Sequence, residues 1–189
     1  MSAPPPKLAS TTPSPPTREL ESAPLSTLQR DVWLDQAFQP ENPHYNAGIY
    51  ARIDGTIDVS LFRRALDHVL NHHEGLRVVL VPGDELPNQK VLPHVTSDLT
   101  YLDFSAHEDA DARAREWIDR TAAVPFTLMG SPLFRFALLK VADDRYYWLP
   151  QYHHMIIDGS TAILVIQEVA DAYNALLAGQ EPSERQSTS

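Results

Sequence analysis

Apolar side chains recur along this chain with two spacings, which predict helices and strands in an irregular order. Intervals of three and four residues indicate amphipathic helices, and these follow Asp58, lie within 105–121 and occupy 163–177. Alternating or short apolar runs indicate strands, expected at 46–55, 76–83, 91–95, 100–104, 133–141 and 145–154. The last two segments are separated by a short acidic turn and predict an antiparallel pair near the sheet centre. The pattern favours an α/β fold with a mixed, largely antiparallel sheet covered by helices.

Capping residues predict where the helices begin and end. Ser26 and Gln29 match a capping box, in which each side chain bonds a free backbone N–H, so a first helix is expected over 26–38. Pro150 has no N–H to give to a sheet, which predicts a bulge or an edge position there. The other expected boundaries are Asp58 and Gly75 for the second helix, Ser105 with Glu108 for the third, and Gly179 for the last.

Composition separates one folded unit from two polar ends. Residues 1–24 contain seven prolines and few large apolar side chains, so a disordered or polyproline-like leader is expected. Residues 25–181 carry the periodic pattern and suit one domain, and 182–189 are expected to form a flexible tail.

Charge and residue usage exclude several kinds of function. The formal net charge of −10 disfavours a nucleic-acid partner. The absence of cysteine removes disulfides, thiolate metal sites and a cysteine nucleophile. No run approaches the roughly 20 apolar residues of a membrane helix, and the start lacks the apolar core of a signal peptide. These features predict a cytoplasmic protein without a membrane partner.

Candidate chemistry gathers in YHHMIIDGST, residues 152–161. His153 and His154 end an extended segment, where successive side chains point to opposite faces, so only one of them faces a given cleft. An imidazole with a pKa near 6.5 can take a proton from an amine or hydroxyl nucleophile. Asp158 and Gly159 lie directly before the last helix, where a carboxylate suits the helix dipole and glycine lets a substrate approach the backbone.

Other interpretations of this stretch compete with catalysis. A purely structural histidine pair stays open on residue chemistry alone. A metal site using His153, His154 and Asp158 is disfavoured because adjacent strand histidines diverge and no spaced histidine completes the set. A serine hydrolase lacks the G-x-S-x-G elbow, and Ser160 is better explained as a cap. We therefore expect neither a metal site nor a cofactor-binding site.

Three segments in order resemble the motifs of condensation domains in non-ribosomal peptide synthetases, within the chloramphenicol-acetyltransferase-like superfamily. YHHMIIDG resembles the HHxxxDG motif, LSTLQRDVW at 25–33 resembles the first motif of the family, and HHEGLRVVL at 72–80 resembles the second. The stretches 40–55 and 144–159 look most like domains of the enterobactin-synthetase type. The second motif departs from the family pattern, with His72 in place of arginine and Val78 in place of threonine.

The resemblance implies a fold, a reaction and a role for each residue. It covers about 25–181 and corresponds to the N-terminal lobe of a domain that holds two such lobes. It implies that His154 acts on the amine attacking a carrier-bound acyl thioester. Asp158 then holds the loop by pairing with an arginine, for which Arg77 is the candidate. Gly159 lies beside the intermediate, and His153 is structural.

The resemblance also implies partners and rivals. Peptidyl or acyl carrier proteins would supply the phosphopantetheine arms, no cofactor is expected in this chain, and the C-terminal lobe is absent from it. Two alternatives remain: a compact trimeric acyltransferase that uses acyl-coenzyme A, and a carrier-docking module without activity. The intact histidine pair argues against the cyclising subclass, whereas epimerising relatives share it.

Overall fold

A five-stranded sheet forms the centre of the molecule in the computed structural model, which describes residues 22–183. Its strand order is β2-β8-β7-β6, with β3 also paired to β8. Only β6 and β7 run parallel, so the predicted mixed, largely antiparallel sheet is confirmed. The strands are β2 (Asn46–Gly48), β3 (Ala51–Asp54), β6 (Thr100–Asp103), β7 (Phe134–Ala142) and β8 (Arg145–His153).

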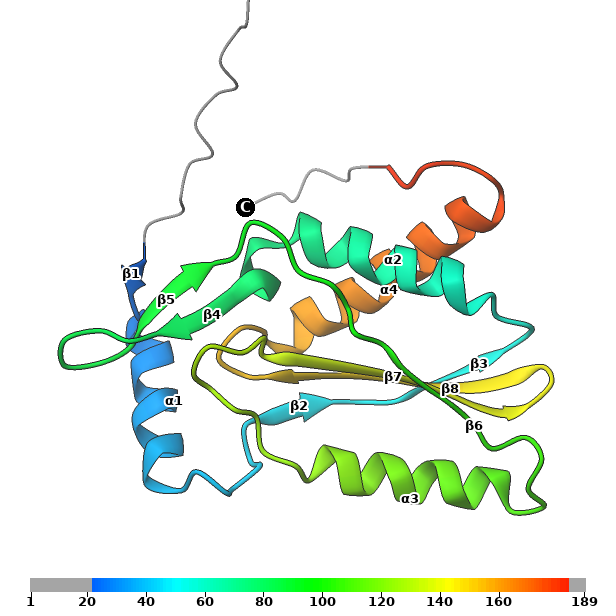
Figure 1. Ribbon diagram of the computed structural model, residues 1–189, viewed down its shortest axis with the longest axis horizontal. Coiled ribbons are helices and arrows are strands. Elements are labelled where there is room, and N and C mark those ends of the chain that lie inside the picture. The colour runs from blue at the N-terminus through cyan, green and yellow to red at the C-terminus, as the bar shows by residue number, and fades with distance from the viewer. Residues whose placement is uncertain (1–21, 184–189) are drawn as a thin grey trace, which may run out of the picture.

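Three helices cover the two faces of this sheet (Figure 1). Helices α2 (Val59–His72) and α4 (Gly159–Leu177) pack together on one face, where they bury the larger hydrophobic cluster. Helix α3 (Ala110–Ala122) lies on the other face over a smaller cluster. Both faces of β7 and β8 are thus covered, which explains their nearly continuous apolar sequence.

The long β7–β8 hairpin supplies the middle of both clusters. Side chains alternate along a strand, so Leu138 joins the cluster under α2 and α4 while Leu139 joins the cluster under α3. Both leucines are fully buried. The expected central antiparallel pair is confirmed, with a register shift between Lys140 and Ala142.

Pro150 of β8 lies opposite a break in the neighbouring segment, which pairs with β8 on the side away from β7. The His154 N–H donates to the Tyr45 carbonyl on that side, so by alternation the ring nitrogen of Pro150 faces the same side. Strands β2 and β3 pair with β8 in the same register. The two residues between them, Ile49 and Tyr50, belong to neither strand. In that register they would stand opposite Pro150 and Leu149. The single strand expected over 46–55 is therefore two strands, and the ladder breaks opposite the residue that has no N–H.

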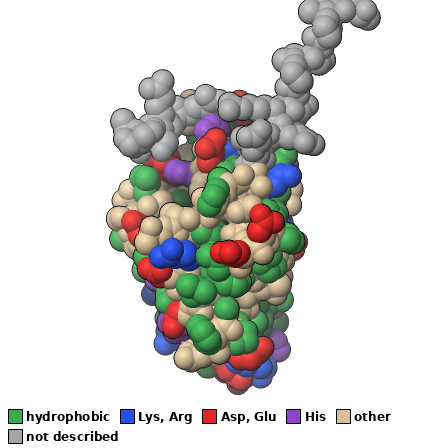
Figure 2. Space-filling view, turned by 90° about the vertical axis from the view of Figure 1, so that its left-hand side faces the viewer, with side chains coloured by type: hydrophobic (Ala, Val, Ile, Leu, Met, Phe, Trp, Pro, Cys, Tyr) green, Lys and Arg blue, Asp and Glu red, His purple; other side chains and the backbone are tan. Residues whose placement is uncertain are grey.

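A second, three-stranded sheet stands at one end of the molecule beside α1 (Thr27–Phe38). It consists of β1 (Ala23–Pro24), β5 (Asn88–Val91) and β4 (Val78–Val81). Ala23 and Pro24 pair with Gln89 and Asn88, so the last two residues assigned to the leader belong to the fold. The rest of the leader, 1–21, and residues 184–189 of the tail lie outside the described residues. On this end of the molecule, hydrophobic side chains are interspersed with acidic and basic ones (Figure 2).

Several predicted helix boundaries are confirmed. Ser26 and Gln29 form both bonds of the capping box, and Asp58 caps α2 by accepting from Ser60 and Leu61 N–H. At the end of α4, Gly179 takes a φ of +72° and donates to the Leu176 carbonyl, as a left-handed glycine cap does.

Other predicted boundaries are wrong. Helix α2 ends at His72 and runs into a 3₁₀ turn, η1 (Glu74–Arg77), so Gly75 lies inside a turn and caps nothing. Helix α3 begins at Ala110, and its N-cap Asp109 makes no side-chain cap bond. Ser105 bonds Asp103 and does not form the predicted box with Glu108. In the segment expected as a strand over 91–95, only Val91 is in a strand.

Candidate active site

The turn between β8 and α4 brings the two histidines and Asp158 together at the end of the sheet. The His153 N–H donates to the Leu133 carbonyl at 2.9 Å on the β7 side. The His154 N–H donates to the Tyr45 carbonyl at 2.9 Å on the β2 side. The backbone is thus held on both sides immediately before the chain leaves the strand.

His153 is an interior residue with 1% of its surface exposed. Its Nδ1 accepts the Met155 N–H at 3.2 Å, which in the neutral ring leaves the hydrogen on Nε2. The rings of Tyr45 and Phe126 lie against it, with centroids at 5.8 and 6.0 Å. Burial first, and then the nearby His154 and His44, lower the pKa of His153 to about 4. His153 is therefore neutral at pH 7 and shapes the turn that carries His154.

His154 is exposed to solvent beside its buried neighbour. Its Nδ1 lies 3.3 Å from the carbonyl oxygen of Ile157. Because a carbonyl oxygen only accepts, this contact places the hydrogen on Nδ1 and the free lone pair on Nε2. A fixed imidazole with an exposed basic nitrogen has the form of a general base. The expected divergence of the two histidines is confirmed, since one lies in the interior and the other faces solvent.

Asp158 is the N-cap of α4. Its Oδ1 accepts the Thr161 N–H at 2.8 Å and the Ser160 hydroxyl at 2.9 Å. These bonds, that from the Thr161 backbone first, lower the pKa of Asp158 to about 2. The carboxylate therefore stays charged at neutral pH and ties the end of the turn to the helix.

The predicted pair between Arg77 and Asp158 is wrong. The Arg77 guanidinium is buried and donates to the carbonyls of Leu92 and Pro93. No ion pair joins it to Asp158 within residues 22–183. Arg77 instead fastens the segment after β5, and Asp158 is held by hydrogen-bond donors of its own helix.

Gly159 is the first residue of α4, directly after Asp158. A Cβ added to it would meet no atom of the described chain within 4 Å, and its φ does not lie in the left-handed region. Neither packing nor backbone conformation within residues 22–183 therefore requires glycine at this position.

The sequence did not reveal the residues that surround His153. Tyr45 and Phe126 come from distant parts of the chain, and their contacts depend on how the strands and the loop after α3 meet. Gln151 was the one available signal, because it is a polar residue inside an apolar strand. It is 1% exposed and donates to the Ala122 carbonyl at 3.1 Å.

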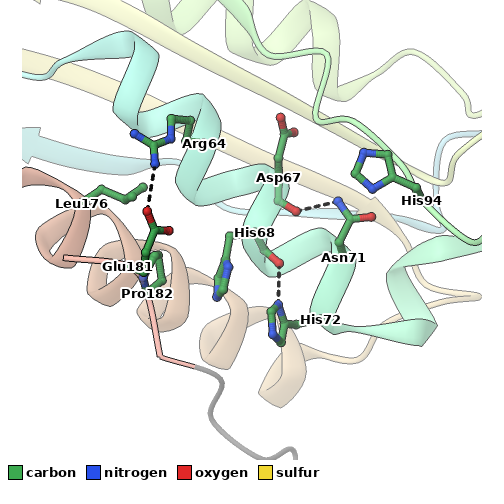
Figure 3. A pocket seen from close by; sticks show the side chains of 9 residues that line it. All are labelled: Arg64, Asp67, His68, Asn71, His72, His94, Leu176, Glu181 and Pro182. Atoms are coloured by element: carbon green, nitrogen blue, oxygen red, sulfur yellow. Dashed lines mark hydrogen bonds and ion pairs between the residues drawn. The ribbon is translucent and has the colours of Figure 1, made fainter. Parts of the chain in front are cut away.

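A hollow of about 350 Å³ lies between α2 and the segment that follows α4 (Figure 3). It is lined by His68, His72 and His94, but none of the predicted site residues borders it. Several of its polar groups already have partners, such as Arg64 with Glu181 at 3.7 Å and His72 Nδ1 with the His68 carbonyl at 2.9 Å. Among the described residues no group of three or more His, Asp and Glu side chains could hold a metal ion.

The structure is a mixed α/β fold in which a helix-covered sheet presents one exposed histidine at the end of a central strand, and comparison with known proteins specifies the family. The family model of the condensation domain matches residues 19–189. This chain belongs to the condensation domain family. No helix in residues 22–183 is long and apolar enough to span a membrane.

Similar proteins are non-ribosomal peptide synthases. A dimodular nonribosomal peptide synthase of Bacillus subtilis (strain 168) is 34% identical over 90% of this chain, and an isonitrile lipopeptide synthase of Streptomyces coeruleorubidus is 35% identical over 83%. The chain covers 7% and 11% of these two proteins. It therefore matches a small part of large, multidomain enzymes.

Solved condensation domains share the fold. The starter condensation domain of rhizomide synthetase superposes with a TM-score of 0.83 at 34% identity, over 87% of this chain and 40% of that one. A variant of that domain is known in complex with C8-CoA. The first condensation domain of the calcium-dependent antibiotic synthetase, in complex with a substrate analogue, gives a TM-score of 0.78 at 30% identity, over 86% of this chain and 39% of that one.

Proposed function

We propose that this chain is the N-terminal lobe of a condensation domain that forms an amide bond between an acyl or peptidyl thioester on one carrier protein and an amino acid on another. The observation that carries the proposal is the state of His154, which is exposed, held through Nδ1 and free at Nε2. Family membership supplies the reaction class, and the chain itself supplies the group that handles the proton.

His154 is the catalytic residue in this proposal. Its Nε2 accepts the proton of the acceptor amine as nitrogen attacks the thioester carbonyl, or orients that amine by a hydrogen bond. The C–S bond of the thioester then breaks, and the departing thiolate of the phosphopantetheine arm takes up the proton that the amine gave up, returned by His154 where its Nε2 had accepted it. The buried, neutral His153 adds no positive charge beside this base at neutral pH.

Asp158 and Gly159 form the rest of the site. Asp158 keeps the turn in register as the cap of α4, without the arginine that the family resemblance implies. Gly159 leaves the backbone at the start of α4 open, which supports a close approach of the reacting group there. The chain binds no cofactor of its own in this proposal, since both phosphopantetheine arms arrive with carrier proteins.

The test is detection of the amide product by intact mass. The chain is mixed with one acylated and one aminoacylated carrier protein, alone and with a second lobe from a related condensation domain. His154→Ala is compared with His107→Ala, which alters an exposed histidine that lies before α3. Product that is lost in His154→Ala and kept in His107→Ala supports the proposal. Product retained in His154→Ala overturns the role of His154, and no product in either arrangement overturns the function.

The form of the donor is a second variable, because a related starter domain is known with C8-CoA. Replacing the acylated carrier by an octanoyl-coenzyme A donor tests whether a carrier is needed. Equal product from both donors would favour the acyl-coenzyme A alternative, for which a trimer by sedimentation is the further requirement. Carrier binding without product from either donor would favour a docking module.

A further inference from the structure

Four polar side chains meet on the face of the sheet that α3 covers, just beyond the end of that helix. Asn46 of β2 stands directly opposite His153, and Arg135 of β7 stands directly opposite Gln151. Partners opposite each other share a face, and so do His153 and Gln151, which are two residues apart. Asn46, Arg135, Gln151 and His153 therefore form one patch across three neighbouring strands.

The segment 122–126 covers this patch in place of a helix. Carbonyl groups of this segment accept five hydrogen bonds from the side chains of Asn46, Arg135 and Gln151. These three residues are here called the carbonyl clamp. Asn46 donates to Ala122 at 2.8 Å and Val124 at 2.9 Å, Gln151 to Ala122 at 3.1 Å, and Arg135 to Val124 at 2.7 Å and to Pro125.

The clamp resolves a problem of backbone chemistry. The last carbonyl groups of a helix have no partner within the helix, and a carbonyl without a partner is costly where water is excluded. Ala122 is the last residue of α3, and its carbonyl is taken by two side chains of the sheet. The fork of Arg135 then binds two further carbonyls in a geometry that lysine does not reproduce.

The clamp contacts Phe126, the residue whose ring covers His153. The Arg135 guanidinium lies 4.0 Å from the centre of the Phe126 ring, and Phe126 meets the His153 ring edge to face. His153 in turn accepts the Met155 N–H, inside the turn that carries His154. A continuous set of contacts thus runs from the clamp through Phe126 and His153 to that turn.

We propose that Asn46, Arg135 and Gln151 are positioning residues for the histidine pair: by fixing the segment 122–126 they hold Phe126 over His153 and thereby set the turn that presents His154. The catalytic consequence rests on the proposed function, whereas the effect on His153 does not. None of the three touches His154, so they act through Phe126 and His153.

Two variants test the proposal through sets of carbonyls that share only Val124. Asn46→Leu removes the bonds to Ala122 and Val124 without changing the net charge, and Arg135→Met removes those to Val124 and Pro125 together with the stacked cation. Arg135→Lys keeps the charge but not the fork. Asn174→Leu, on an exposed position of α4, is the matched control.

The first readout is the titration of His153 by nitrogen and carbon chemical shifts of the imidazole rings, measured on the chain without substrates. The ionisable groups around His153 are His154 and His44, which all variants retain, and Arg135 itself, which only Arg135→Met removes. We expect Asn46→Leu and Arg135→Met to raise the His153 pKa from about 4 toward 6.5, because water reaches the ring. Asn174→Leu should leave it unchanged and Arg135→Lys should fall between.

The second readout is amide formation, where a shifted His154 should lower kcat by up to roughly 10²-fold with KM nearly unchanged. A folded Asn46→Leu or Arg135→Met whose His153 still titrates near 4 overturns the proposal, whatever its melting temperature. If one variant does not fold, the other decides. Failure of the wild type to form amide would overturn the proposed function. The positioning role of the clamp would then be tested by the His153 titration alone.

Discussion

The two faces of the five-stranded sheet are covered in different ways. Under α2 and α4, apolar side chains from both helices and from alternate positions of β7 and β8 form one large buried cluster. Under α3 the apolar cluster is smaller, and past the end of that helix it gives way to polar residues that bind backbone carbonyls. The first face is built for stability, and the second, where the histidine pair begins, holds a loop in a defined position.

This difference has a physical reason. Apolar contacts are strong but non-directional, so they tolerate small shifts of a helix on a sheet. Hydrogen bonds to carbonyl groups depend on direction, and they fix the position of a segment more closely. Placing the polar patch at the end of β8 puts directional contacts next to the group whose orientation matters.

The largest expected effect separates chemistry from stability at the end of β8. His154→Ala should lower the rate of amide formation by about 10²–10⁴-fold, the usual contribution of a positioned base. Since the ring is exposed, its removal should leave the melting temperature close to that of the wild type. Single-turnover kinetics with calorimetry measures both quantities. A large loss of stability in His154→Ala would contradict the conclusion that stability comes mainly from the face under α2 and α4.

The two faces can be compared directly through adjacent leucines of β7. Leu138→Ala and Leu139→Ala remove the same side chain from fully buried positions on opposite faces. Each should cost about 2–5 kcal/mol of unfolding free energy. Leu138→Ala should cost more, because α3 carries small Ala110 and Ala114 on its buried face and can move closer to fill the space.

Urea unfolding of both variants measures this difference. The control is Leu177→Ala, at the exposed end of α4, which should cost far less. A larger cost for Leu139→Ala than for Leu138→Ala would reverse the ranking of the two faces.

A smaller effect concerns acid stability at the polar patch. The pKa of His153 is lowered in the folded protein to about 4 from an ordinary value near 6.5, so the unfolded chain binds its proton first. Its contribution to stability is fully present above pH 6.5 and is lost as the pH falls from 6.5 through 4, by at most about 1.4 kcal/mol per pH unit.

His153→Asn isolates this contribution, because the amide oxygen can still accept the Met155 N–H and does not titrate. The difference in unfolding free energy between wild type and variant should change between pH 7 and pH 4, while all other groups cancel. A constant difference over that range would show that His153 is not held neutral.

The smallest effect is expected at Asp158, which is exposed at the start of α4. Asp158→Ala removes the cap and should lower the melting temperature less than Leu138→Ala does, whereas Asp158→Asn keeps a capping oxygen and should fall between. The pKa of Asp158 is lowered to about 2, so its stabilisation is present above its ordinary value of 3.8 and is lost as the pH falls through 2. Equal melting temperatures for all three proteins would contradict its structural role.

Predictions that depended on neighbouring residues were the most accurate. The Ser26 box, the Asp58 cap and the Gly179 cap each join groups within a few residues, and each is confirmed. The capping box predicted for Ser105 and Glu108 is wrong. The N–H and hydroxyl of Ser105 donate to the nearby Asp103 carboxylate. Gly75 failed as a helix end because η1 continues the chain as a tighter turn.

Within the site, the divergence of the two histidine side chains was predictable and their surroundings were not. Alternation along a strand requires adjacent side chains to diverge, so one histidine had to differ from the other. Which of the two is buried depends on Tyr45 and Phe126, and these lie far away in the sequence. Arg77 shows the same limit, since a motif position gave no information on the carbonyls of Leu92 and Pro93.

The sequence by itself determined the mixed α/β class, the central hairpin and the position of the turn with two histidines before the last helix, because these follow from periodicity and from bonds between near neighbours. Only the tertiary structure decided the break opposite Pro150, the carbonyl partners of Arg77 and the clamp formed by Asn46, Arg135 and Gln151. Each of these depends on which donor reaches which carbonyl after distant strands have paired. Hydrogen bonds act over about 3 Å, so their partners are settled only once packing has brought the segments together.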